Sequence, residues 1–178
     1  MPKLYILCGP SGCGKSTWAH NFLNNTEDDI RYVSRDEIRF SMLEEDDDYF
    51  AHETEVYRQF TGTLRATLVD GFDVIADATH LTKASRKRLT QAIDTYYKDY
   101  EIIYVVFHTT FDQCVLNDMG REGLAQVGID IISGMFRSYV IPTLDEDPRA
   151  IQIIDVGEGD PNSYSYLNWP YQYGGTNE

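Results

Sequence analysis

The sequence has little of what secreted, zinc-binding and membrane proteins need. Its three cysteines, Cys8, Cys13 and Cys114, are an odd number and lack the spacing of a zinc site. No apolar run approaches the roughly 20 residues that cross a bilayer. The first residues, Met1 to Lys3, lead into an apolar segment without a signal-peptide pattern. We therefore expect a cytoplasmic protein with reduced thiols and no membrane partner.

Positive charge is also scarce, with 15 Lys and Arg against 29 Asp and Glu and a formal net charge of -14. A protein that holds long nucleic acid by its backbone usually presents a basic surface, so this charge argues against an extended nucleic-acid groove. Much of the excess lies in two short acidic runs, Thr26 to Asp29 and Glu44 to Asp48, which we expect to be solvated loops. The composition still allows a small basic site elsewhere.

The chain of 178 residues, 42% of them hydrophobic and 25% charged, has the composition of an ordinary globular domain. Short β-type runs alternate with longer segments of helical periodicity. This alternation predicts an α/β fold, with a mostly parallel five-stranded sheet and helices on both faces. The expected strands are Lys3 to Cys8, Ile30 to Ser34, Phe72 to Asp77, Glu101 to His108 and Ala150 to Val156.

Two helices are predicted from apolar residues that recur every three or four positions. The first ends at Gly71 and the second begins near Thr82. The expected apolar faces are Phe50, Thr54, Tyr57, Phe60, Leu64 and Leu68 on the first helix, and Leu89, Ala92, Ile93, Tyr96 and Tyr97 on the second. After Asp160 the sequence is rich in turn formers and aromatic residues without periodicity, so we divide the chain into a domain at 1–160 and an aromatic tail at 161–178.

The segment GPSGCGKST, Gly9 to Thr17, matches the P-loop pattern GxxxxGK[ST] in full, between an expected strand and an expected helix. The backbone N–H groups of such a loop and the start of the helix hold phosphate. Lys15 is expected to contact the β and γ phosphates of ATP and to act in catalysis, and Ser16 to bind Mg²⁺. The predicted nucleotide-binding residues are Gly9, Ser11, Gly12, Cys13, Gly14, Lys15, Ser16 and Thr17.

The end of the second strand, VSRDEIRFSML, carries a candidate for the phosphoryl acceptor side. Asp36 follows the apolar residues, at the carboxyl edge of the sheet where α/β folds bind ligands. Arg39 lies one helical turn further, on the same face. A carboxylate there can take the proton from a hydroxyl, and an arginine can hold an anionic group of the acceptor. The alternative is an N-capping Asp beside an exposed Arg.

In sequence order, the segments GPSGCGKSTWA, SRDEIRFSM, VIADATHL and MGREGLAQVGID resemble the kinase domain of the phage-type polynucleotide kinase family. The similarity runs from Lys3 to about Tyr139. It implies a P-loop kinase fold with a helical lid, and ATP and Mg²⁺ held by Lys15 and Ser16. It further implies that Asp36 is the general base for a 5′-hydroxyl and that Arg39 contacts the acceptor's phosphate.

The end of the third strand carries Asp77, for which the sequence leaves three roles open. Its position fits a carboxylate near the metal ion. The resemblance implies instead that Asp77 supports the acceptor site, with Thr79 lining that site. Capping of the next turn is the third role.

The resemblance also implies a lid after the fourth strand, in which Arg121 stabilises the transferring phosphoryl group and Val127 makes an apolar contact with the acceptor base. The family's upstream lid arginine is replaced here by Leu116 or Asn117. Bifunctional members carry a D-x-D-G-T phosphatase signature, which Ile153 to Asp160 does not match. We therefore expect a kinase without a phosphatase domain.

A basic cluster of Lys83, Arg86, Lys87 and Arg88 lies at the start of the second predicted helix. Positive charge is mildly unfavourable there, so a phosphate-facing role competes with a solvated helix face. Together the patterns predict an ATP-dependent kinase that acts on a hydroxyl, with nucleic-acid 5′ ends of DNA or RNA as first choice. A kinase for a small-molecule or modified-base hydroxyl and a nucleotide-dependent binding module are the alternatives.

Overall fold

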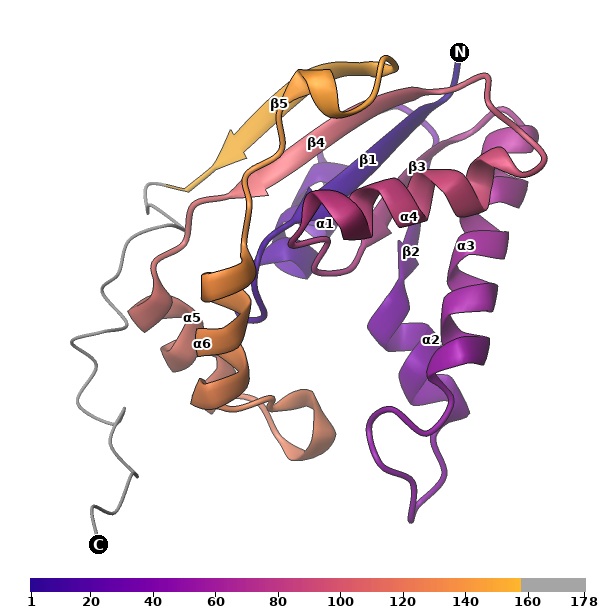
Figure 1. Ribbon diagram of the computed structural model, residues 1–178. Coiled ribbons are helices and arrows are strands. Elements are labelled where there is room, and N and C mark those ends of the chain that lie inside the picture. The colour runs from indigo at the N-terminus through magenta and orange to yellow at the C-terminus, as the bar shows by residue number, and fades with distance from the viewer. Residues whose placement is uncertain (158–178) are drawn as a thin grey trace, which may run out of the picture.

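The sheet has five parallel strands in the order β2-β3-β1-β4-β5, with helices on both faces (Figure 1). The computed structural model describes residues 1–157, so the predicted domain boundary and the aromatic tail at 161–178 lie outside the described residues. The prediction of a five-stranded parallel α/β sheet is confirmed. The strands are β1 (Lys3–Cys8), β2 (Ile30–Ser34), β3 (Asp73–Asp77), β4 (Glu101–Phe107) and β5 (Ala150–Val156).

Strand β1 lies in the middle of the sheet, and its side chains alternate between two hydrophobic cores. Leu4, Ile6 and Cys8 belong to the core under α3 (Glu53–Val69) and α4 (Lys83–Asp94). Tyr5 and Leu7 belong to the core under three helices on the opposite face. These helices are α1 (Lys15–Asn24), α5 (Phe111–Met119) and α6 (Ile129–Ser138). Period-two alternation along one strand therefore explains why both faces are covered.

The two predicted helices exist, but their apolar faces differ from the expectation. Phe50 precedes α3 and is 66% exposed, whereas Val56 is fully buried. Helix α4 begins after Thr82, close to the predicted start, and the Thr82 side chain caps it in a capping box with Ser85. Tyr96 lies beyond the end of the helix and is 77% exposed. Both errors arose at helix ends, where apolar residues in the adjoining loops continue the helical spacing by chance.

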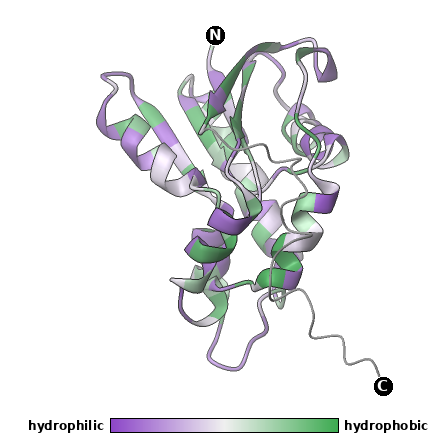
Figure 2. Ribbon diagram, turned by 90° about the vertical axis from the view of Figure 1, so that its left-hand side faces the viewer, coloured by the Kyte–Doolittle hydropathy of each residue, from purple (hydrophilic) through white to green (hydrophobic). Residues whose placement is uncertain are grey.

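Helix α2 (Arg35–Met42) starts directly after β2, because the Ser34 hydroxyl accepts a hydrogen bond from the Glu37 N–H. The loop after α2 contains the acidic run and projects furthest from the carboxyl edge of the sheet (Figures 1 and 2). The acidic residues of this loop are exposed except Asp47, which is half-buried, and this agrees with the expected solvated loop. Two 3-10 turns, η1 (Gly123–Ala125) and η2 (Leu144–Glu146), complete the described elements. No helix in residues 1–157 is long and apolar enough to cross a membrane.

The turn after β3 contains a buried histidine. His80 has a φ of 41°, in the left-handed region, and is 7% exposed. Its Nδ1 lies 2.9 Å from the Leu7 carbonyl oxygen and therefore donates the hydrogen bond, and its ring stacks on Phe60 at 6.2 Å between centroids. Burial lowers the pKa of His80 from the ordinary 6.5 to about 4.

His80 is expected to make the fold sensitive to mild acid. The unfolded chain binds a proton at His80 below about pH 6.5, whereas the folded chain does so only near pH 4, so stability falls as the pH drops between these values. The free energy of unfolding should lose about 3 kcal/mol from this group. Urea unfolding at pH 7 and pH 4 should show a weaker pH dependence for His80→Asn than for wild type. The exposed-site variant His20→Gln is the control, and equal pH dependence in all three proteins would refute the assignment.

Candidate active site

A cleft of about 580 Å³ opens at the carboxyl edge of the sheet. Its walls are the P-loop with the start of α1, the end of β3, helix α2 with its loop, and the segment that leads into α6. The α5–α6 and α2 elements project on either side of this edge (Figure 1). Twelve predicted site residues line the cleft: Ser11, Gly12, Gly14, Lys15, Ser16, Thr17, Asp36, Arg39, Asp77, Thr79, Arg121 and Val127.

The P-loop has the closed backbone that phosphate binding requires. A Cβ on Gly12 would lie 2.3 Å from the Cys114 carbonyl oxygen, and the φ of Gly12 is 79°, so only glycine fits there. Gly14, with a φ of 97°, turns the chain into α1. The Lys15 Nζ lies across the loop, 3.0 Å from the Gly9 oxygen and 2.7 Å from the Pro10 oxygen. The helix start and this ammonium together make an anion site.

The remaining predicted nucleotide-binding residues, Gly9 and Cys13, support the loop from behind. Cys13 is buried, its Sγ would lie 2.6 Å from a Cβ on Gly9, and its carbonyl accepts a 2.8 Å hydrogen bond from Thr109. Burial raises the pKa of the Cys13 thiol, so the thiol stays protonated. Cys13 therefore fills space beneath the loop and does not line the cleft.

Ser16 and Asp77 lie side by side at the end of β3. The Ser16 hydroxyl donates to Asp77 Oδ2 at 2.7 Å, and the Tyr32 hydroxyl donates to the same oxygen at 2.6 Å. Asp77 is 6% exposed, and burial followed by the charge of Asp77 raises the pKa of Tyr32, which keeps that hydroxyl a donor. A hydroxyl beside a carboxylate fits Mg²⁺, which takes hard oxygen ligands and keeps several waters. This geometry favours the metal-side role of Asp77 over the capping role.

The acceptor-side candidates form a compact charged group on α2. Arg39 is 4% exposed and donates to the Asp36 carboxylate, to Glu53 Oε2 at 2.8 Å and to the Tyr49 hydroxyl at 2.8 Å. Tyr49 in turn donates to Asp36 Oδ1 at 2.8 Å. The Asp36 side chain is 59% exposed, and its Oδ2 has no partner among residues 1–157. The group thus orients one carboxylate and leaves one of its oxygens free to accept a proton.

The lid side of the cleft is attached directly to the P-loop. Arg121 donates to the Ser11 hydroxyl at 2.8 Å, which brings its guanidinium to the P-loop. Asn117 donates to the Gly12 carbonyl at 2.7 Å, so its amide also contacts the P-loop. The buried carboxylate of Asp118 accepts hydrogen bonds from the N–H groups of Val127 and Gly128 at 3.1 and 2.9 Å. These contacts place Val127 on the cleft wall.

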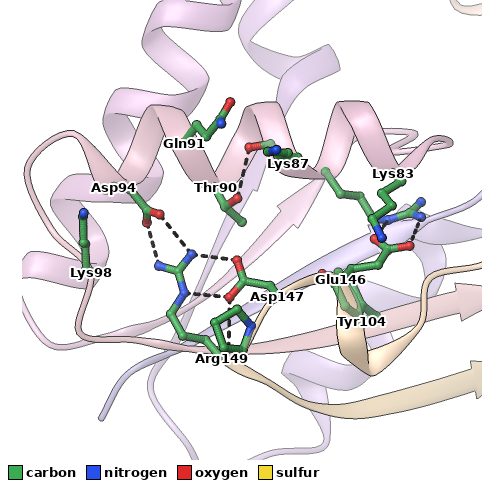
Figure 3. A pocket seen from close by; sticks show the side chains of 12 residues that line it. Lys83, Lys87, Thr90, Gln91, Asp94, Lys98, Tyr104, Glu146, Asp147 and Arg149 are labelled. Carbon is green, nitrogen blue, oxygen red and sulfur yellow. Dashed lines mark hydrogen bonds and ion pairs between the residues drawn. The ribbon is translucent and has the colours of Figure 1, made fainter.

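For Arg86 in the basic cluster at the start of α4, both interpretations are wrong: the side chain neither faces a phosphate site nor lies on a solvated helix face. Arg86 is 1% exposed, and its guanidinium forms a two-bond ion pair with Glu146 at 2.7 and 2.8 Å. It also donates to the carbonyls of His80 and Val140 at 2.9 and 3.0 Å. Lys83 and Lys87 line a separate hollow between α4 and η2 (Figure 3). Arg86 therefore joins α4 to the chain before β5.

Sequence reasoning missed the partners that hold the site residues in place. Glu53 and Tyr49 orient Arg39 and Asp36, and Tyr32 orients Asp77. The contact of Asn117 with the P-loop was not predicted, and no sequence pattern indicated that Asp118 binds the backbone before α6. An acid or tyrosine within twenty residues of a reactive Asp–Arg pair is too common to single out without coordinates.

The chain matches the AAA domain family over residues 4–133. It belongs to that family. The match covers most of the chain, includes every predicted site residue, and agrees with the P-loop kinase-type fold described above. No curated protein matches the chain.

Solved structures similar to this AAA domain include several P-loop kinases. A chain from "Structure of Pnkp1/Rnl/Hen1 complex" is 27% identical, with a TM-score of 0.56, over 65% of this chain and 38% of that chain. A chain from "Structure of the Pnkp1/Rnl/Hen1 RNA repair complex" is 25% identical, with a TM-score of 0.58, over 78% of this chain and 46% of that chain. This chain thus spans less than half the length of either. A sugar kinase from Janibacter sp. HTCC2649 is 15% identical, with a TM-score of 0.60, over 87% of this chain and 86% of that chain, and shows the shared fold.

Proposed function

We propose that this protein transfers the γ-phosphoryl group of ATP to the 5′-hydroxyl end of DNA or RNA. The observation that carries the proposal is the position of Asp36, which lines the same cleft as Lys15, Ser16 and Arg121 and has one carboxylate oxygen without a partner among residues 1–157. A nucleotide site alone fits many functions. An oriented carboxylate in the same cleft is what a hydroxyl acceptor requires.

In the proposed reaction, the loop N–H groups and Lys15 bind the β and γ phosphates, and Arg121 adds positive charge beside Ser11. Mg²⁺, bound through Ser16 and supported by Asp77, would neutralise phosphate charge. Asp36 accepts the proton of the acceptor hydroxyl as its oxygen forms the bond to the γ phosphorus. The bond between that phosphorus and the bridging oxygen breaks, and ADP leaves. Arg39 holds Asp36 and contributes its charge to the acceptor's phosphate.

Two observations support a nucleic-acid end as the acceptor. The two chains from Pnkp1/Rnl/Hen1 complexes are at least 25% identical to this one. The acceptor walls of the cleft carry exposed apolar side chains, Phe40 and Phe50 on one side and Leu124 and Ile131 on the other, which suit a planar base. Contact with a few nucleotides at a chain end is compatible with an acidic protein.

A kinase for a smaller hydroxyl compound is the second candidate. It is favoured by Glu53, which already neutralises much of the positive charge that Arg35 and Arg39 would offer to a phosphate. The acidic run Glu44 to Asp48 adds negative charge near the same wall. Both features suit an acceptor of low negative charge. A nucleotide-driven binding module remains third, because an oriented Asp36 has no evident use there.

The deciding experiment is transfer of labelled γ phosphate from ATP with a panel of acceptors. The panel contains a short 5′-hydroxyl DNA, the matching RNA, a nucleoside and a hexonate sugar. Labelling of the oligonucleotides with a kcat/KM at least tenfold above that of the small acceptors is the expected result. Labelling of the sugar or nucleoside alone would move the function to the second candidate. Hydrolysis of ATP with no acceptor labelled would favour the binding module.

A further inference from the structure

Arg88 on α4 and Arg35 on α2 lie against the same aromatic ring. The guanidinium carbon of Arg88 is 4.4 Å from the centroid of the Tyr57 ring, and that of Arg35 is 5.3 Å from it. Arg35 lines the active-site cleft and Arg88 does not. The two arginines therefore extend the positive charge from the cleft wall to the surface beside it. Arg88 faces α3, whereas its neighbours Lys83 and Lys87 line the hollow on the other side of α4.

The charges around this ring do not balance. Glu53 pairs with both Arg35 and Arg39, and Asp36 pairs with Arg39. Arg88 pairs with no carboxylate in the part of the chain that the structure describes. Three guanidinium groups therefore share two carboxylates, in a protein whose formal net charge is -14. A surplus of positive charge is the unusual feature in such an acidic molecule.

The same group contains buried polar atoms without hydrogen-bond partners. Within the described residues these are Arg35 Nε, Arg39 Nε and the Tyr57 hydroxyl. Most buried polar groups in folded proteins are paired, and each orphan costs free energy until it finds a partner. Burial, followed by the charge of Arg39 and with a smaller contribution from Arg88, lowers the pKa of Arg35. An anion bound here would relieve both the missing hydrogen bonds and the repulsion between cations.

We propose that Arg88, Arg35 and the Tyr57 hydroxyl form a second phosphate subsite, which binds a phosphodiester of the acceptor strand beyond the one nearest the reacting hydroxyl. The proposal rests on the proposed function. The reacting hydroxyl lies at Asp36, the first phosphate lies by Arg39, and the strand continues over the cleft wall at Arg35. Arg88 is exposed, and its guanidinium lies against the Tyr57 ring where the strand would pass. A polynucleotide end fills the subsite, and a monophosphate or a sugar does not.

The test compares acceptors that have one or two phosphates. A nucleoside 3′-phosphate carries one, and a dinucleotide with a 3′-phosphate carries two. Arg88→Gln is expected to raise the KM for the dinucleotide about tenfold, with kcat unchanged, and to leave the KM for the mononucleotide as it is. Arg65→Gln is the matched control, because Arg65 also stacks on a tyrosine, at 4.7 Å, but on Tyr96 and not on the Tyr57 ring that Arg35 contacts. Equal kinetics for Arg88→Gln and wild type with the dinucleotide would overturn the proposal.

A binding measurement separates this proposal from the function on which it rests. The probe is a fluorescent dinucleotide with a 3′-phosphate and a 5′-deoxy end, which cannot be phosphorylated. Wild type should bind it about tenfold more tightly than Arg88→Gln at low salt. The slope of log binding constant against log salt concentration should be smaller for the variant by about one. If wild type binds the probe in an Arg88-dependent way but transfers no phosphate to a 5′-hydroxyl dinucleotide, the result would contradict the proposed kinase function and support the phosphate subsite. Binding that ignores Arg88 would overturn the subsite whatever the transfer assay gives.

Discussion

Replacing Asp36 by Asn is expected to lower the rate of phosphoryl transfer by about 10²- to 10⁴-fold, with ATP affinity unchanged. The amide keeps the shape of the side chain and accepts the hydrogen bond from Tyr49, but it cannot take a proton. The loss should appear in kcat, because the acceptor hydroxyl reaches the same position without being deprotonated. The measurement is single-turnover transfer to the 5′-hydroxyl oligonucleotide, together with calorimetric binding of ATP.

The matched control is Glu37→Gln, which changes the next carboxylate on α2. Glu37 is exposed and does not line the cleft, so its variant should transfer phosphate at the wild-type rate. Full activity in Asp36→Asn would show that another group takes the proton. A parallel loss of ATP binding would show that Asp36 supports the nucleotide site, which would weaken the proposed division of the cleft into nucleotide and acceptor sides.

Replacing Arg86 by Met is expected to lower the free energy of unfolding by about 3–5 kcal/mol. The substitution leaves the Glu146 carboxylate, whose side chain is 6% exposed, without its partner, and two carbonyls lose a donor. The unfolding midpoint in urea measures the effect. Lys87→Met, on the exposed side of the same helix, should change stability by less than about 0.5 kcal/mol.

The double variant Arg86→Met with Glu146→Leu tests the cause of this loss. If the unpaired buried charge is responsible, removal of both charges should recover most of the lost stability. A double variant as unstable as Arg86→Met would instead assign the loss to the hydrogen bonds with His80 and Val140. An unchanged midpoint in Arg86→Met alone would contradict the buried ion pair.

The sequence predicted the strands more accurately than the helices and the reactive residues more accurately than their partners. Strands β1, β2 and β5 match the expectation residue for residue, because each is a short apolar run bounded by polar or turn-forming residues. The apolar faces of α3 and α4 were misjudged at their ends, since Phe50 and Tyr96 keep a helical spacing outside the helices. Spacing alone does not mark where a helix stops.

For the site, the P-loop could be predicted because its chemistry is local. Every residue of the loop lies within nine positions, and the pattern specifies glycine where the backbone allows nothing else. Arg86 could not be predicted, because its partner Glu146 lies sixty residues away, and a basic run at a helix start is usually solvated. The role of Glu53 could not be predicted either, because Glu53 binds Arg39 across the loop between α2 and α3.

The central place of β1 also determines the order in which the chain can fold. Leu4 pairs with Val74 on one side and with Ile102 on the other, so the sheet closes only after large stretches of chain have come together. The P-loop takes its shape from these later segments, through Gly9 to Thr79 and through Cys13 to Thr109. During synthesis, the emerging first third of the chain therefore carries the P-loop sequence without its conformation. We therefore expect the loop to become able to bind phosphate only after β4 and the residues that follow it have left the ribosome and docked.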